Sequence, residues 1–175
     1  MMKKLLMVAF FSSLSIQAQN APKPLPVDQW KPLLFLIGTW EARTQGGSAG
    51  AASSGTYTFQ LELRNHVLVR HASAVGCKGP ADFDCEHADI LYIYQAASGQ
   101  PYSAIYFDNE GHVILYEVTT PGPNTAIFLS DASQPGPQFR LTYELRQSGM
   151  FGKFQVRMPG QTEYRSYLEW GGEKK

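Results

Sequence analysis

The chain has few of the side chains from which catalytic and metal centres are usually built. Its 175 residues include two cysteines and four histidines. Closely spaced histidine pairs of the zinc type, phosphate-cradling glycine loops and CxxC are absent from the sequence. Catalysis therefore finds little support in the motifs, and no cofactor is predicted.

An excess of one charge is also lacking. Fifteen basic and fifteen acidic residues give a formal net charge of zero, and no long run of one sign occurs. A basic surface is the usual mark of proteins that bind nucleic acids or anionic membranes. The sequence therefore predicts neither kind of partner.

Long hydrophobic runs are lacking as well. A membrane-spanning helix needs about 20 successive apolar residues, and the apolar run at 5–11 is far shorter. This run follows two lysines and leads to a small-residue exit near Ala18, which is the layout of a secretory signal peptide. We therefore expect a leader at 1–18, no integral membrane segment, and a soluble product that is periplasmic or secreted.

The part after the leader has the size of one domain. Cleavage after Ala18 leaves 157 of the 175 residues. We expect a Pro-rich tether at 19–26 and a folded domain at 27–175. The sequence does not indicate an oligomeric state.

Aromatic residues, glycine and proline are abundant, which favours many short strands joined by turns. Asp28 is placed to cap a short helical turn that ends near Leu36, before Gly38. Ten strand-like runs follow, at 39–45, 55–64, 67–75, 88–95, 102–108, 112–119, 125–130, 138–146, 151–158 and 162–170. Their short connections require antiparallel neighbours. The sequence therefore predicts an all-β fold, a single ten-stranded antiparallel up-and-down barrel.

Several of these strands alternate between apolar and polar residues. Tyr57, Phe59, Leu61 and Leu63 are predicted to share one face, with polar residues between them. A sheet this wide avoids exposed edges by closing on itself. Because about eight strands already make a barrel that side chains just fill, ten strands leave room for a small ligand.

The two cysteines, Cys77 and Cys85, are expected to form a disulfide, because the predicted leader sends the chain to an oxidising compartment. Closing so short a loop contributes about 2.5 kcal/mol in the chain-entropy account. The alternative is a zinc site that adds Asp82, Asp84 or His87. Its spacing matches no standard zinc motif, so we favour the disulfide and predict no metal.

The segment 35–40, Phe-Leu-Ile-Gly-Thr-Trp, resembles the start of calycins, the superfamily of lipocalins and fatty-acid-binding proteins, and of ten-stranded nitrobindin-type barrels. The resemblance implies a lipocalin-like barrel with structural roles for Gly38 and Trp40. It also implies that Trp40 lies at the closed end under an arginine, here Arg157 or Arg165. Segments 104–116, 139–143 and 167–170 are similar to an uncharacterised group of exported bacterial calycin-like proteins.

For function, the resemblance implies carriage of a small, largely apolar ligand. This sequence differs from those families in two respects, which limits the functional properties that the resemblance implies. The stretch 46–55 shows no pattern for the portal helices of fatty-acid-binding proteins. Haem-binding relatives use a C-terminal histidine, but no histidine follows His112, so haem is not implied.

Candidate ligand-binding residues gather between positions 106 and 116. Alternation predicts that His112 and Tyr116 point inward, because Glu117 marks the outer face, with Tyr106 on the adjoining strand. An imidazole and two phenols in an apolar pocket fix the polar end of a ligand. The alternative is that they are wall residues satisfied by water or by one another. Residues 108–111 are interpreted as a turn rather than a cation loop.

Three arginines are further candidates. Arg165, with Tyr167, resembles the R-x-Y element that grips a carboxylate in fatty-acid-binding proteins, although a surface position is the alternative. The inward or outward direction of Arg70 and Arg140 is open. A buried arginine here would imply an acidic partner or ligand, because an unpaired buried charge is costly.

Three functional hypotheses follow from these patterns. The leading one is an exported binding protein for a small hydrophobic or amphipathic molecule held inside the barrel. The second is an enzyme of isomerase or hydrolase type that uses the same pocket through His112. The third is a solid barrel that acts as an interaction module.

Overall fold

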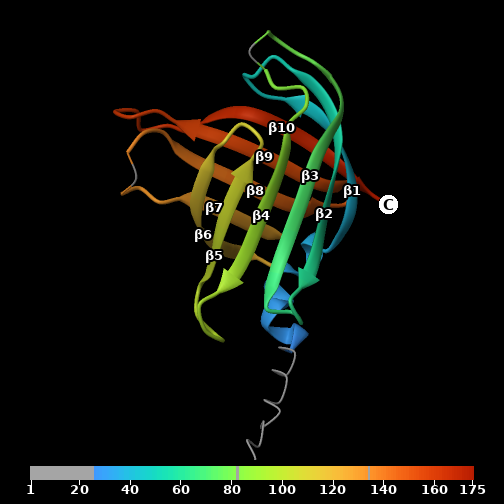
Figure 1. The fold of residues 1–175 in the computed structure, drawn as a ribbon, viewed down its shortest axis with the longest axis vertical. Helices are drawn as coiled ribbons and strands as arrows, with labels where there is room; N and C mark the ends of the chain where they lie inside the picture. The colour runs from blue at the N-terminus through green and yellow to red at the C-terminus, as the bar shows by residue number, and fades with distance from the viewer. Residues whose placement is uncertain (1–25, 82, 134) are drawn as a thin grey trace, which may run out of the picture.

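The computed structural model of the chain describes residues 26–81, 83–133 and 135–175. Its architecture is a closed barrel of ten antiparallel strands with one short helix near the N-terminus (Figure 1). The predicted fold class is therefore confirmed. The predicted leader at 1–18, almost all of the tether, and Asp82 lie outside the described residues.

Each strand pairs with its neighbours in the sequence, and the last strand pairs with the first. The strands are β1 (Gly38–Gly46), β2 (Ala52–Glu62), β3 (Val67–Lys78), β4 (Ala88–Gln95), β5 (Tyr102–Asp108), β6 (Val113–Gly122), β7 (Thr125–Ser130), β8 (Gln138–Arg146), β9 (Gly149–Arg157) and β10 (Arg165–Lys174). In the closing pair, Trp40 lies opposite Lys174. Closure gives both outermost strands a partner, so this sheet has no exposed edge.

Several strand boundaries differ from the sequence prediction, and two of the differences are at the end of β2 and in β10. Residues 63–65 form a tight turn with φ of 47°, 58° and 67°, so Leu63 leaves the strand and is 75% exposed instead of facing inward. The preceding inward residues, Tyr57 and Phe59, are buried as predicted. The last strand begins at Arg165 rather than at 162 and runs on to Lys174.

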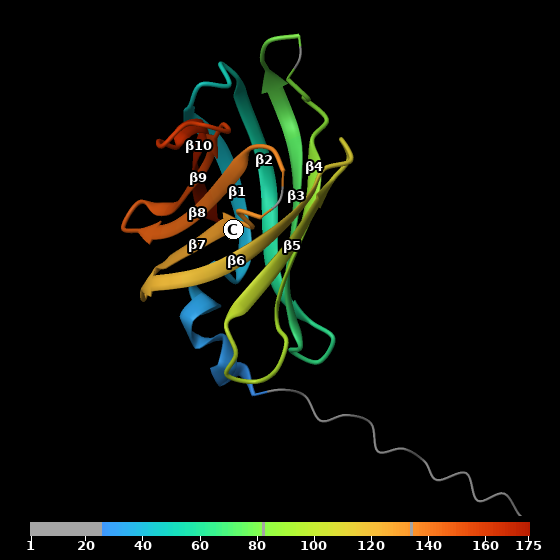
Figure 2. The ribbon, with the colours of Figure 1, turned by 90° about the vertical axis from the view of Figure 1, so that its left-hand side faces the viewer.

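A short 3-10 helix, η1 (Val27–Leu36), covers one end of the barrel, at the bottom of Figures 1 and 2. Its apolar side chains Trp30, Leu33 and Leu36 are fully buried, and the Trp30 indole Nε1 donates to the backbone oxygen of Asn65 at 2.8 Å. The predicted helical turn is confirmed. The predicted cap is wrong, because the helix begins one residue before Asp28 and has no side-chain cap.

The same end of the barrel is filled by aromatic side chains. Tyr143 lies edge-on to Phe59, with ring centroids 5.3 Å apart, and edge-on to Phe128 at 6.2 Å. Each such contact between aromatic rings contributes about 0.5–1.5 kcal/mol to the stability of the fold, in addition to the contribution from burying apolar surface. Helix η1 and these rings therefore make one end of the barrel solid.

Gly38 and Trp40 lie where η1 passes into β1. Gly38 has a φ of 130°, and a Cβ there would lie 2.6 Å from Cε of Lys174, so the position favours glycine. Trp40 is buried, and its Nε1 donates to the backbone oxygen of Leu36 at 2.9 Å. The cation over its ring is Lys174, with Nζ 5.4 Å from the centroid.

The expectation that an arginine covers Trp40 is therefore wrong. Arg157 lies on the outer face of β9 and covers the ring of Tyr164. Arg165, at the start of β10, is exposed. The physical reason is the register between β1 and β10, which places Lys174, at the end of β10, opposite Trp40.

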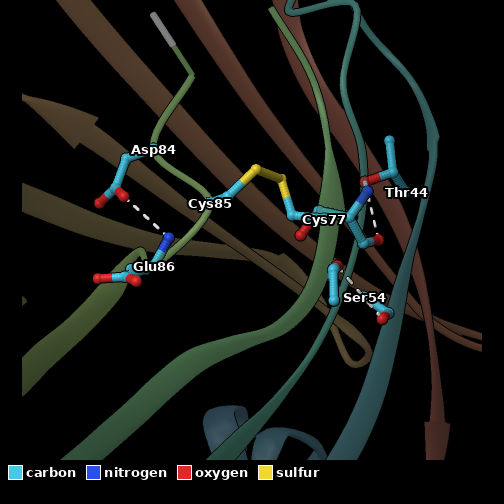
Figure 3. Close-up of a disulfide and its surroundings, with 8 residues drawn as sticks. Thr44, Ser54, Cys77, Asp84, Cys85 and Glu86 are labelled. Atoms are coloured by element: carbon cyan, nitrogen blue, oxygen red, sulfur yellow. Dashed lines mark hydrogen bonds between the residues drawn. A yellow bond between two sulfur atoms is a disulfide. The ribbon is translucent and has the colours of Figure 1, made fainter. Parts of the chain in front are cut away.

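The predicted disulfide is present. Cys77, near the end of β3, is bonded to Cys85 in the loop before β4, with Cα atoms 5.3 Å apart (Figure 3). The two sulfur atoms are therefore not available as zinc ligands. The bond holds the β3–β4 loop at the end of the barrel opposite η1 (Figure 1).

Candidate functional site

A cavity of about 510 Å³ occupies the barrel at the end opposite η1. This lies within the range of about 300–1,000 Å³ that is usual for small-molecule sites. Much of its wall is apolar or aromatic because inward residues of successive strands alternate with outward polar ones. Apolar lining residues include Ile114, Phe139, Leu141, Phe154, Val156 and Trp170.

A buried ion pair lies in the cavity wall. The Arg70 guanidinium on β3 contacts the carboxylate of Asp89 on β4, and each side chain is 6% exposed. Arg70 also donates to the hydroxyl of Tyr143. Burial disfavours both charges, but their mutual attraction outweighs it, so the pKa of Arg70 is raised and that of Asp89 is lowered.

Strand register brings these two charges together. Asp89 lies opposite Ala72 in the ladder, and Arg70 lies opposite Leu91, so the charged residues are diagonal neighbours. Long side chains in diagonal positions on one face reach each other. Arg70 therefore has an acidic partner within the protein, and its charge does not require a ligand.

A second polar group extends from this pair to the rim. His87 Nε2 lies 3.4 Å from Asp89 Oδ2 and 3.2 Å from the hydroxyl of Tyr106. The Tyr106 hydroxyl donates to Asp108 Oδ2 at 3.2 Å. His112 Nδ1 lies 2.9 Å from the same oxygen. These contacts form a continuous chain of polar groups along one side of the cavity.

The environment sets the ionisation of this chain. Hydrogen bonding to Asp89, which outweighs burial, raises the pKa of His87. Burial opposes the charge of Asp108, but hydrogen bonds from the His112 backbone and imidazole outweigh it and lower the pKa of Asp108. Burial raises the pKa of Tyr106, so its phenol stays a proton donor.

Four of the six predicted ligand-binding residues line this cavity: Arg70, Tyr106, His112 and Tyr116. Tyr116 is buried on the inner face of β6, whereas His112 precedes that strand and its side chain is 62% exposed at the rim. His112 therefore faces the opening rather than the interior, because β6 begins only at Val113.

Arg140 and Arg165 do not line the cavity. Phe139 and Leu141 point inward, so the alternation of β8 turns Arg140 outward. There its guanidinium lies 4.3 Å from the centroid of Tyr164. Arg165 is exposed at the start of β10, which agrees with the surface alternative for this residue.

His87 and Asp89 line the cavity but were not predicted as ligand-binding residues. Asp89 had a detectable signal, because it is a lone carboxylate in phase with the inward residues Leu91 and Ile93. His87 was considered only as a zinc ligand beside the cysteines, because it lies in the β3–β4 loop, where no periodicity indicates the direction of a side chain.

A serine motif in the first hairpin carries no site. Residues 46–50 read Gly-Gly-Ser-Ala-Gly, the spacing of a hydrolase nucleophile elbow. That elbow needs a strand-to-helix turn, but this segment connects β1 and β2. Ser48 is exposed, and its backbone N–H donates to the backbone oxygen of Ser166 at 3.0 Å.

No protein-family model matches the chain, and no curated protein matches it either. Among the described residues, no helix has the length and apolar character needed to cross a membrane. The fold and the cavity define the class of closed ten-stranded antiparallel β-barrels, and this architecture is compatible with a calycin-like fold.

Proposed function

We propose that the chain is an exported, calycin-like binding protein that carries a small amphipathic molecule inside its barrel. In this proposal residues 1–18 are a cleaved leader, 19–26 a tether and 27–175 the binding domain. The disulfide between Cys77 and Cys85 is compatible with an oxidising compartment such as the periplasm or the extracellular space.

The observation that carries the proposal is the cavity of about 510 Å³ with two unlike sides. One side bears aromatic and aliphatic groups from β6, β8, β9 and β10, and the other bears the polar chain from Arg70 to His112. The apolar part of an amphipathic ligand buries its surface against the first side of the cavity, and the polar end of the ligand hydrogen-bonds to the second side. A solid barrel offers no such space.

The polar end of the ligand is assigned to Tyr106, with Tyr116 deeper in the wall and His112 at the rim. Since Asp89 balances the charge of Arg70, an anionic head group is not required. This differs from the carboxylate grip of fatty-acid-binding proteins, in which the R-x-Y arginine points into the barrel. Here the matching residue, Arg165, lies outside the cavity.

The direct test is native mass spectrometry of the protein isolated from the compartment into which it is exported. We expect a retained small molecule that denaturation releases. Consistently empty protein that also fails to take up the apolar fluorescent probe Nile red would refute the proposal.

A matched pair of variants locates the binding. Ala72 lines the cavity, so Ala72→Phe places a ring in the ligand space and is expected to weaken Nile red binding about tenfold or more. The neighbouring His71 is exposed and does not line this cavity, so His71→Phe is expected to bind as the parent does. Equal binding by both variants would place the probe elsewhere.

Catalysis in the same cavity is the second candidate, favoured by one observation. The side chain of Asp108 is 4% exposed and lies 2.9 Å from Nδ1 of His112, an arrangement that orients an imidazole as a base. Conversion of the retained molecule by purified protein, abolished in His112→Ala, would establish it. Equal conversion by that variant would rule out this role for His112.

A further inference from the structure

Two polar segments that are far apart in the sequence meet at the rim of the cavity. One is the β3–β4 loop with Asp84 and His87, and the other is the β5–β6 turn with Asp108, Glu110 and His112. The β3–β4 loop alone has too few ligands for a metal ion, whereas the β5–β6 segment supplies three. The barrel places them side by side, with His87 Nδ1 3.0 Å from Glu110 Oε1.

The donor atoms of these segments are grouped as a coordination site requires. Asp84, His87 and Glu110 form one set whose donor atoms lie within 4.8 Å of one another. Asp108, Glu110 and His112 form a second such set, with Glu110 in both. An ion that holds nitrogen and oxygen ligands at about 2.0–2.2 Å brings them to about 3 Å from each other. The His87–Glu110 contact has that length.

An independent observation concerns the other nitrogen of His87. Nε2 faces Asp89 at 3.4 Å, and this carboxylate is 6% exposed and paired with Arg70. Metal-bound histidines usually direct their second ring nitrogen to a carboxylate, which fixes the ring and makes the ligand more basic. Asp89 stands in this position behind His87.

The backbone on both sides is also fixed. Cys85, one half of the disulfide, directly follows Asp84 (Figure 3) and precedes His87 by two residues in the sequence. Asn109 accepts from the backbone N–H of Ala88 at 2.9 Å and donates to the backbone oxygen of Glu86 at 3.2 Å. The loop and the turn are therefore held together before any ion arrives, which reduces the ordering cost of binding.

We propose that a divalent transition-metal ion of the zinc type binds at the mouth of the barrel, with Glu110 as the ligand common to both sets and the other ligands drawn from Asp84, His87, Asp108 and His112. Imidazole nitrogens with carboxylates suit Zn²⁺, whereas Ca²⁺ and Mg²⁺ prefer oxygen ligands alone. The site is independent of the proposed carrier function, because it needs no occupant in the cavity.

The test is calorimetric titration of Zn²⁺ into untagged, chelator-treated protein with its disulfide intact. We expect binding that is weakened at least about tenfold in His87→Ala and in His112→Ala, since losing even a residue that only supports a metal ligand costs about 10–100-fold. The chain offers matched controls in its two other histidines, His66 and His71. Neither belongs to the candidate ligand sets, so His66→Ala and His71→Ala are expected to keep the parental affinity.

A further variant separates binding from folding. Glu110→Gln keeps the shape of a largely exposed side chain, and thermal unfolding checks that each variant is folded. Loss of Zn²⁺ affinity in folded Glu110→Gln supports the site. Parental affinity in Glu110→Gln and in both rim-histidine variants, or an equal loss in all four histidine variants, would overturn it. Tighter binding of Ca²⁺ than of Zn²⁺ by the parent would also overturn the assignment.

Discussion

Replacing Arg70 with methionine is expected to destabilise the barrel by about 3–5 kcal/mol, because it removes the guanidinium that compensates the buried carboxylate of Asp89. Solvent screens this ion pair little, since both side chains are only 6% exposed. Loss of the bond to the Tyr143 hydroxyl acts in the same direction. Arg70→Met combined with Asp89→Leu removes both charges and is expected to recover most of this loss.

The assay is urea unfolding followed by fluorescence of the three tryptophans, which lie in η1, β1 and β10. Arg146→Met serves as the control, because Arg146 pairs with Glu144 at 2.8 Å on the surface, where the side chains are 44% and 41% exposed. Such a pair contributes about 0–1 kcal/mol. A loss below about 1 kcal/mol in Arg70→Met, or a double variant as unstable as the sum of its singles, would refute the reasoning.

Two further predictions concern packing and the disulfide. A Cβ on Gly152 would lie 2.0 Å from the Trp170 ring, whereas one on Gly122 meets nothing within 4 Å; thermal unfolding should show Gly152→Ala destabilised by about 1–3 kcal/mol and Gly122→Ala nearly unchanged. Equal melting temperatures would contradict this. Reduction of the Cys77–Cys85 bond should lower the free energy of unfolding by about 2.5 kcal/mol, measured by urea unfolding with and without reductant. An unchanged midpoint would contradict the chain-entropy account of this bond.

The fold was predictable because local signals agree along the chain. Alternation with a period of two placed Tyr57, Phe59 and Tyr116 on the inner face. The turn residues and short connections indicated that successive strands are antiparallel neighbours. The number of strands indicated that the sheet closes into a barrel. Prediction failed where a strand ends early, as at Leu63, and where the register between strands matters, as opposite Trp40. At the shift in register between Ser166 and Leu168, alternation breaks, and both Tyr167 and Leu168 line the cavity.

The candidate site was predictable only in part, because its groups come from segments whose proximity depends on register and loop shape. Tyr106 and Tyr116 follow from their own strands. The pairing of Arg70 with Asp89 requires the exact offset of β3 against β4, and neither strand alone contains that information. The contact between His87 and Glu110 depends on the conformations of the β3–β4 loop and the β5–β6 turn at the rim. No periodic pattern in the sequence predicts these conformations.

The pairing of β1 with β10 has a consequence for how the barrel forms. It joins residues 38–46 to residues 165–174, so the ring of hydrogen bonds cannot close until nearly the whole chain is present. Contacts between residues so distant in sequence make folding slow, on the order of milliseconds to seconds. The unclosed chain keeps the backbone N–H and C=O groups of both outer strands unpaired during that time, which leaves them open to pairing with another chain.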